Sequence, residues 1–360
     1  MKPLLINLQE YGLSEHFAKE AALHDGLFPA RVSEQHRDLY RVICSGGELS
    51  ARVAGRLARG ADDPTCFPAV GDWVMIDRQD SDSGDAIIHH ILPRRSVLVR
   101  QSAGKTPFGQ VIAANIDTIF ICMSLNEDFN LRRVERYLAI TWDSMAVPVI
   151  LLTKSDLCRD LDEKLSELSE VSAGVDVLIC SAAQDIGFGQ IRSQIKPGHT
   201  VAFIGSSGVG KSTIVNRLFG REVLATQAIR EDDGKGRHTT TYRQLLLLPG
   251  GGIVIDTPGM RELQIYTANL SMAFEDIEEL AAQCRFSDCS HRSEPGCAVR
   301  AAIAEGRLSA ERLESFSKLQ REAGYAGLNS RQREQEKLNK MFGGKSAVKQ
   351  LRKQVKSRNR

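Results

Sequence analysis

The stretch GHTVAFIGSSGVGKSTIVNRLFG (residues 198–220) decides the fold of this chain. Its apolar run at 201–204 predicts a buried strand, and the residues from Ser212 onward predict a helix. The loop between them has the pattern G-x-x-x-x-G-K-S, which binds phosphate when a strand precedes it and a helix follows. The alternative is a glycine-rich turn that arises by chance, for which no strand before it or helix after it is needed.

The chemistry of this loop follows from its residue types. Glycines let backbone N–H groups turn inward around phosphate oxygens, and the helix N-terminus adds partial positive charge. Lys211 is expected to reach the β- and γ-phosphates, and the Ser212 hydroxyl to bind Mg²⁺. The predicted nucleotide contacts here are Gly205, Ser206, Ser207, Gly208, Val209, Gly210, Lys211, Ser212 and Thr213.

Further apolar runs before and after this loop predict a parallel α/β sheet, because buried strands alternate with helices. Ligands of such sheets sit at the carboxyl ends of the strands. The predicted strands lie in 115–124, 147–156, 175–182 and 252–255, and the predicted helices in 131–145 and 162–171.

Asp256-Thr-Pro-Gly259 follows one of these strands. An Asp at a strand end downstream of a phosphate loop suits Mg²⁺ binding, and Gly259 suits sensing of the γ-phosphate. Alone, the tetrapeptide is also compatible with an ordinary turn.

Thr153-Lys154-Ser155-Asp156 ends another strand and suggests a guanine site. An Asp carboxylate can accept hydrogen bonds from guanine N1–H and the N2 amino group, and adenine offers no such pair. Lys154 can lay its aliphatic stem over the base, and Ser181-Ala182 can offer a backbone N–H to guanine O6. Thr153 replaces the usual Asn, which puts part of the loop-to-loop anchoring in doubt. In isolation, the tetrapeptide fits a solvated turn equally well.

Together these signatures indicate a GTPase, but their order differs from the usual one. The base motif and Ser-Ala precede the phosphate loop, and Asp-x-x-Gly comes last. The order indicates a circular permutation, which is tolerated where the original termini lie close together. As a consequence, Asp256–Gly259 leads directly into the C-terminal region, and we hypothesise that nucleotide state is passed to it.

The segment REDDGKGRHTTT (230–241) is the predicted first switch, with Thr239 or Thr240 reaching Mg²⁺. Met260 stands where Ras-like enzymes place a water-orienting Gln, and a thioether cannot take that role. His238 is therefore the catalytic candidate, because imidazole can orient water or act as a base near neutral pH. The alternative is an ordinary surface-loop histidine.

The region before the sheet predicts a small β barrel. Residues 35–100 read as short strands between Gly, Asp and Ser turns, and HRDLYRVICSGGELSARVAG has a hairpin pattern around Gly46-Gly47. Such a barrel is of SH3 or OB type, and the residue pattern does not separate the two.

Three cysteines and a histidine within fourteen residues predict a zinc site: Cys284, Cys289, His291 and Cys297. Three thiolates and an imidazole form a closed tetrahedral set, which suits structural rather than catalytic zinc. The alternative is free thiols clustered by chance. Residues 298–323 then read as helices split near Gly306, with Ser309 as a cap.

Composition bounds the class of protein. Hydrophobic residues make up 42% and charged residues 26%, which is globular, and 360 residues suggest two or three domains. Neither a run of eighteen apolar residues nor a secretory signal is apparent, so we expect a cytoplasmic protein with no membrane partner. Residues 331–360 hold eleven Lys/Arg against two Asp/Glu. This basic tail suggests a polyanionic partner, or else only a solvated segment.

With these motifs in view, the chain resembles the RsgA (YjeQ) family of bacterial, circularly permuted GTPases. The resemblance covers about residues 35–330 and includes P-A-V-G-D-W-V (68–74), G-R-H-T-T-T (236–241) and D-T-P-G-M. It implies an N-terminal OB-fold barrel (1–105), a permuted P-loop GTPase domain (106–270), a mostly helical zinc domain (271–345) and a basic tail (346–360).

The resemblance also implies a function. GTP, with Mg²⁺, would be hydrolysed on the small ribosomal subunit late in its assembly, with the barrel contacting ribosomal RNA and the subunit stimulating slow turnover. His238 matches the family's proposed catalytic histidine, and the four Cys/His residues would hold one structural Zn²⁺. We expect a monomer, since no feature asks for an oligomer.

Two other classes of function stay open at this point. In the first, the chain is an RNA-binding module whose nucleotide is structural, a reading that Met260 supports. In the second, it is a signalling GTPase whose basic tail touches anionic lipid, although the chain ends Ser-Arg-Asn-Arg with no prenylation motif. An ATPase is disfavoured by Asp156.

Overall fold

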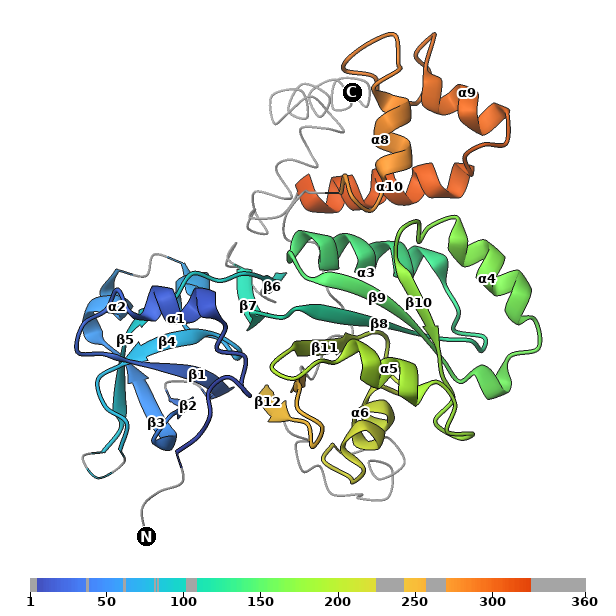
Figure 1. The fold of residues 1–360 in the computed structure, drawn as a ribbon. Helices are drawn as coiled ribbons and strands as arrows, with labels where there is room; N and C mark the ends of the chain where they lie inside the picture. Colours follow the sequence, from blue (N-terminus) through green and yellow to red (C-terminus); the bar gives the residue numbers. More distant parts are fainter. Residues whose placement is uncertain are drawn as a thin grey trace, which may run out of the picture.

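The computed structural model describes residues 5–36, 39–60, 63–80, 82, 84–101, 109–224, 243–256 and 270–324. Figure 1 shows the chain as a barrel (blue), a central α/β layer (green to yellow) and C-terminal helices (orange). The predicted residues His238, Thr239, Thr240 and Gly259, together with the basic tail, lie outside the described residues. Within the described ranges, we find no helix with the length and apolar character that crossing a bilayer requires.

The central layer is a sheet with strand order β10-β9-β8-β11-β13-β12. All neighbours pair in parallel except β12, which is antiparallel to β13. The strands are β8 (Thr118–Ser124), β9 (Val147–Thr153), β10 (Asp176–Ile179), β11 (Thr200–Ile204), β12 (Gln244–Leu247) and β13 (Ile253–Asp256). The predicted parallel α/β layer is confirmed.

Helices cover both faces of this sheet. One apolar core lies under α3 and α4, and a second lies under α5 and α6. Every residue of β8 is buried, as expected for a central strand covered on both faces. The helices are α3 (Leu131–Asp143), α4 (Leu161–Ser169), α5 (Phe188–Gln194) and α6 (Lys211–Phe219), and a 3₁₀ turn spans Ser155–Leu157.

Two boundaries differ from the sequence prediction for a backbone reason. β8 begins at Thr118 rather than residue 115, and α3 ends at Asp143 rather than 145. Asn115 (φ 54°) and Met145 (φ 66°) both adopt the left-handed conformation, which stops a regular strand or helix. At the other end of α3, the Asn130 side chain accepts a hydrogen bond from Arg133 N and caps the helix.

The N-terminal region is a closed barrel in which the strands follow each other in the order β1-β2-β3-β5-β4 and back to β1. β3 and β5 pair in parallel and the other pairs are antiparallel, which is the arrangement of an OB fold. The elements are α1 (Glu15–Ala21), β1 (Phe28–Gln35), β2 (Tyr40–Cys44), β3 (Gly47–Val53), α2 (Gly55–Arg59), a 3₁₀ turn (Pro64–Cys66), β4 (Trp73–Ile76) and β5 (Ala86–Ile91).

β1 begins before the range in which the sequence predicts strands. Ala30 and Val32 face the barrel core, while Arg31 between them is buried on the opposite face of the strand. A charged side chain at a buried position hides the strand from its apolar pattern. After the barrel, a separate hairpin joins β6 (Val97–Gln101) to β7 (Gly109–Ala114). The predicted domain boundary at 105/106 lies between them, outside the described residues, and stays a prediction.

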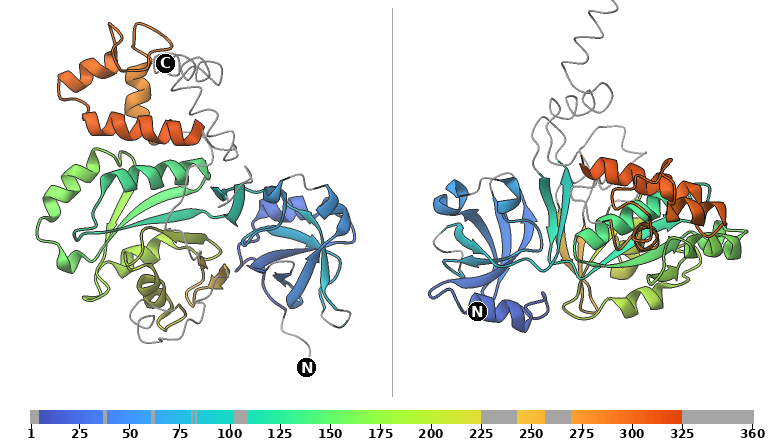
Figure 2. Two further views of the ribbon diagram at one scale, coloured as in Figure 1. Left: turned by 180° about the vertical axis from the view of Figure 1, so that it is seen from behind. Right: turned by 90° about the horizontal axis from the view of Figure 1, so that it is seen from above.

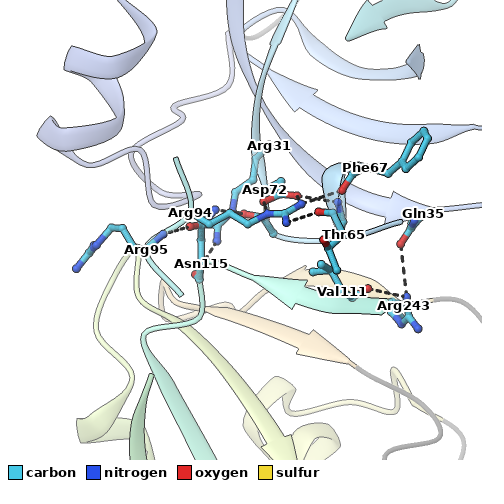
Figure 3. A network of polar contacts seen from close by, with 12 residues as sticks. Arg31, Gln35, Thr65, Phe67, Asp72, Arg94, Arg95, Val111, Asn115 and Arg243 are labelled. Atoms are coloured by element: carbon cyan, nitrogen blue, oxygen red, sulfur yellow. Dashed lines mark hydrogen bonds and ion pairs between the residues drawn. The ribbon is translucent and has the colours of Figure 1, made fainter. Parts of the chain in front are cut away.

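The barrel and the central layer share one sheet. β1 pairs with β12 at Glu34 and Gln244, so eleven strands of the described chain run on without a break. Figure 3 shows the polar contacts at this junction. Arg94 binds the buried carboxylate of Asp72 through two bonds of 2.8 Å, and Arg95 N donates to the Asn115 side chain at 2.9 Å.

The C-terminal helices are α8 (Glu275–Ala281), α9 (Ala298–Ala304) and α10 (Ala310–Gly324). The predicted cap is confirmed, because Ser309 Oγ accepts from Arg312 N at 3.2 Å. α10 lies along α3, as all three views show (Figures 1 and 2). Arg312 binds the buried Glu135 carboxylate at 2.9 Å. Arg136, the next residue of α3, binds Glu322 near the other end of α10 through two bonds of 2.6 and 2.7 Å.

Candidate nucleotide and metal sites

The predicted polar motifs lie at one edge of the central sheet. Lys154, Ser181, Gly205 and Asp256 stand at or just after the carboxyl ends of β9, β10, β11 and β13. The sheet therefore brings together motifs that are up to about a hundred residues apart in the chain, at the edge where α/β sheets bind ligands.

The phosphate loop has the backbone that its glycines predict. Gly205 (φ 148°), Gly208 (φ 74°) and Gly210 (φ 103°) all have positive φ. A Cβ on Gly205 would lie 2.4 Å from the Cys122 carbonyl oxygen on β8, so only glycine fits at that position. Lys211 Nζ donates to the carbonyls of Gly205 (2.8 Å) and Ser206 (2.6 Å), which holds the cation at the loop.

Asp128 contacts the phosphate loop, and the sequence analysis did not single it out. It lies in the turn between β8 and α3, where its Oδ2 accepts from Ser206 Oγ at 2.8 Å and pairs with Arg133 at 2.8 Å. Burial opposes ionisation, but Arg133 and Ser206 outweigh it and hold the pKa of Asp128 below its usual value. The sequence feature that could have identified Asp128 is its position shortly after a predicted buried strand.

Thr153 ties the base motif to the phosphate loop. Its buried hydroxyl donates to the Val209 carbonyl at 2.7 Å. The anchoring that the missing Asn placed in doubt is therefore present, supplied by one hydroxyl in place of an amide. Lys154 follows in the left-handed conformation (φ 58°), and Ser155 N donates to the Cys180 carbonyl at 3.2 Å.

Asp156 is positioned by the neighbouring loop. Its carboxylate accepts a hydrogen bond from the Ser181 hydroxyl, which itself accepts from Gln184 N at 3.1 Å. Ser181 N donates to the Ile186 carbonyl, which folds residues 181–186 into a tight turn. Arg217 of the phosphate-loop helix α6 donates to the Ala182 carbonyl (3.4 Å) and so connects the two loops.

The candidate Mg²⁺ ligands are only partly described. Ser212 lies in the first turn of α6, and Asp256 ends β13, the strand parallel to β11. Their strands are neighbours at the same sheet edge, as the sequence predicts. Thr239 and Thr240, the other candidates, lie outside the described residues.

The predicted zinc ligands form one cluster, since the four donor atoms of Cys284, Cys289, His291 and Cys297 lie within 4.8 Å of one another. Cys284 Sγ is 3.9 Å from Cys297 Sγ, and these sulfurs lie 3.7 and 3.5 Å from His291 Nδ1. Tetrahedral zinc with ordinary bond lengths needs donor separations of about 3.5–3.8 Å. Cys284, His291 and Cys297 lie at or close to these separations, and Cys289 lies within 4.8 Å of them, so the cluster is compatible with zinc.

Local structure prepares this cluster for a metal. His291 adopts a left-handed conformation (φ 58°), which turns its ring toward the cysteines of the same loop. Burial raises the pKa of the Cys284 thiol, but backbone N–H groups of Val299 and Ala298 at the start of α9 outweigh it and lower the pKa below its usual value. The thiolate, the form that binds metal, is thereby favoured at Cys284, whereas burial raises the pKa of the Cys289 thiol to about 11.

Comparison with known proteins places these sites in one family. The family model "RsgA GTPase" matches residues 91–266, and an ABC transporter model matches residues 188–345, a range that also contains the phosphate loop. The small ribosomal subunit biogenesis GTPase RsgA 2 of Lactiplantibacillus plantarum is 54% identical over 349 residues, covering 97% of this chain and 98% of that protein. The small ribosomal subunit biogenesis GTPase RsgA of Opitutus terrae is 42% identical, and the match covers 89% of this chain and 91% of that protein.

Solved structures agree. YjeQ from Thermotoga maritima is 26% identical, with a TM-score of 0.61 covering 82% of this chain and 98% of that chain. YloQ, described as a circularly permuted GTPase, has a TM-score of 0.59 at 24% identity, covering 84% of this chain and 96% of its own. The fold of this chain is therefore that of a permuted GTPase with an N-terminal barrel.

Replacing Thr153 by Val should weaken GDP binding about fivefold, because one buried hydrogen bond contributes about 1 kcal/mol. Thr153→Ser keeps the hydroxyl and is the matched control, with an affinity close to that of the original protein. Titration with a fluorescent GDP analogue measures both. Equal affinities for the Val and Ser variants would contradict the role of the hydroxyl.

Removing a zinc ligand should unfold the C-terminal helices selectively. Cys289→Ser is expected to reduce bound zinc from about one ion per chain and to expose α8–α10 to hydrogen exchange while the barrel stays protected. Elemental analysis and hydrogen-exchange mass spectrometry measure these effects. Cys66→Ser, at an exposed free thiol, is the control. Full protection of α9 in zinc-free Cys289→Ser protein would count against a structural metal.

Proposed function

Because the chain belongs to the RsgA GTPase family, we propose that it binds the small ribosomal subunit and hydrolyses GTP to GDP and phosphate late in the assembly of that subunit. The observation that carries this proposal is the full-length similarity to proteins named as small ribosomal subunit biogenesis GTPases. The joined base motif and phosphate loop support it, since they provide a guanine nucleotide site. This function places the protein's action in the cytoplasm.

In the proposed site, GTP lies across the carboxyl edge of the sheet. Asp156 accepts from guanine N1–H and the N2 amino group, and the Lys154 stem covers the base. Ala182 N–H faces guanine O6, because Ser181 N–H is already bonded to Ile186. Lys211 leaves the loop carbonyls and binds the β- and γ-phosphates.

Ser212 and Asp256 would hold Mg²⁺, with Thr239 or Thr240 completing the set. When bound, the ion neutralises charge that develops on the phosphates. His238 orients the attacking water, the role that Met260 cannot take. Gly259 senses the γ-phosphate and leads toward α8, which connects hydrolysis to the zinc domain and to release from the subunit.

We further propose that the partner surface is ribosomal RNA. An OB-type barrel, a zinc domain and a basic tail are each compatible with RNA, which proteins bind largely through shape, phosphate contacts and stacking. Zinc, held by the Cys/His cluster, has a structural role in this scheme. The protein would act as a monomer.

GTP turnover should rise strongly when purified small subunits are added. His238→Ala should lose about 10²–10⁴-fold of the stimulated rate while GDP affinity stays unchanged, because only the water-handling group is removed. His16→Ala, on the exposed face of α1, is the matched control. Tight GTP binding with no stimulation by subunits would instead favour an RNA-binding module with a structural nucleotide.

A further inference from the structure

A cavity of about 510 Å³ lies at the edge of the central sheet opposite the nucleotide site. Its walls come from the N-terminal segment before β1, the β7–β8 turn, the α3–β9 turn and the α5–β11 loop. These segments precede β8, β9 and β11, whereas the nucleotide motifs follow those strands. The five residues of β11 span about 16 Å at 3.3 Å per residue, and this length separates the two sites.

Arg31 provides a buried positive charge beside this cavity. Its guanidinium is 1% exposed and donates to neutral oxygens: the carbonyls of Gly71 (3.3 Å), Asn115 (3.3 Å) and Tyr11, and the Thr200 hydroxyl (2.8 Å). Among the described residues, no carboxylate lies within 4.0 Å of it. Burial lowers the pKa of Arg31 to about 10, which is still charged at neutral pH.

Asp117 and Asp72 act on this charge from a distance, but neither forms an ion pair with Arg31. Asp72 is occupied by Arg94. Asp117 accepts from Thr200 N at 2.8 Å and lies 3.8 Å from both Arg95 and His199. The cavity lining thus includes three cationic side chains, Arg31, Arg95 and Lys196, against the one carboxylate of Asp117. A site with excess positive charge favours an anion.

The rim of the same cavity is apolar. Met145 and Val147 are 77% and 57% exposed, and both line the cavity, as does Leu13. Exposed apolar side chains beside a charged pocket provide a surface for the non-polar part of a ligand. The volume is in the range of small-molecule sites, about 300–1,000 Å³.

We propose that this cavity is a second ligand site, which binds a small phosphate-bearing organic molecule of nucleotide size. The phosphate contacts Arg95 and Lys196, near the buried positive charge of Arg31. The non-polar part of the ligand packs on Met145 and Val147. The site is independent of the proposed GTPase function, because none of its lining residues belongs to the nucleotide motifs.

Binding is tested by equilibrium dialysis with radiolabelled AMP on protein whose phosphate loop is saturated with GDP and Mg²⁺. We expect saturable binding, at least tenfold weaker in an Arg95→Ala, Lys196→Ala double variant. Arg159→Ala removes an arginine near the carboxyl edge of the sheet and is the matched control, with affinity unchanged. Arg31 itself is left intact because its removal risks unfolding.

A spectroscopic readout locates the ligand. Trp73 lies under the Arg31 guanidinium, 5.5 Å from ring to cation, and contacts Phe17, a lining residue. In a Trp142→Phe background it is the only tryptophan, since the chain has two. AMP should change its fluorescence with the same midpoint as the dialysis isotherm.

Three results would overturn the proposal. The first is the absence of saturable AMP binding, and the second is equal affinity in the double variant. The third is a protein that binds single-stranded RNA but not AMP, and whose double variant no longer binds the RNA. That result would assign the cavity to an RNA phosphate instead.

Discussion

The parallel pairing of β8 with β9 on one side and with β11 on the other is the constraint on which the site depends. β9 carries the base motif and β11 the phosphate loop, although the base motif comes first in the chain. Because β8 lies between them and pairs with both in parallel, the two motifs lie at the same edge of the sheet. Their order in the chain therefore does not affect where they meet. A Cβ at Gly205 would strike the backbone of β8, so the same pairing explains why the loop starts with glycine.

Sequence patterns predicted the sheet, the position of the motifs at its edge and the grouping of the Cys/His residues, because each has a local signature. Strands between helices, glycines before a lysine, and clustered cysteines need no distant partner to be recognised. What the patterns could not resolve depends on contacts between segments. Thr153 appeared as a weakened anchor until its hydroxyl was found on Val209. Arg31 hid a strand of the barrel, because its burial depends on oxygens from four other segments.

Contacts between domains connect the nucleotide site to both ends of the molecule. The turn holding Asp128, which contacts the phosphate loop, leads into α3, and α3 carries the ion pairs that bind α10. On the other side, β1 of the barrel pairs with β12, the neighbour of the strand that ends at Asp256. The candidate nucleotide site is thus connected by short, packed routes to the barrel and to the C-terminal helices.

The central claim is that a base motif lying before the phosphate loop in sequence forms one guanine site with it. The most direct measurement compares the affinity of the Asp156→Asn variant for xanthosine diphosphate with its affinity for guanosine diphosphate. An amide donates to the O2 of xanthine where the carboxylate accepted from the guanine amino group. The account predicts that the original protein selects GDP and the variant selects the xanthosine nucleotide. A variant that still prefers GDP would contradict it.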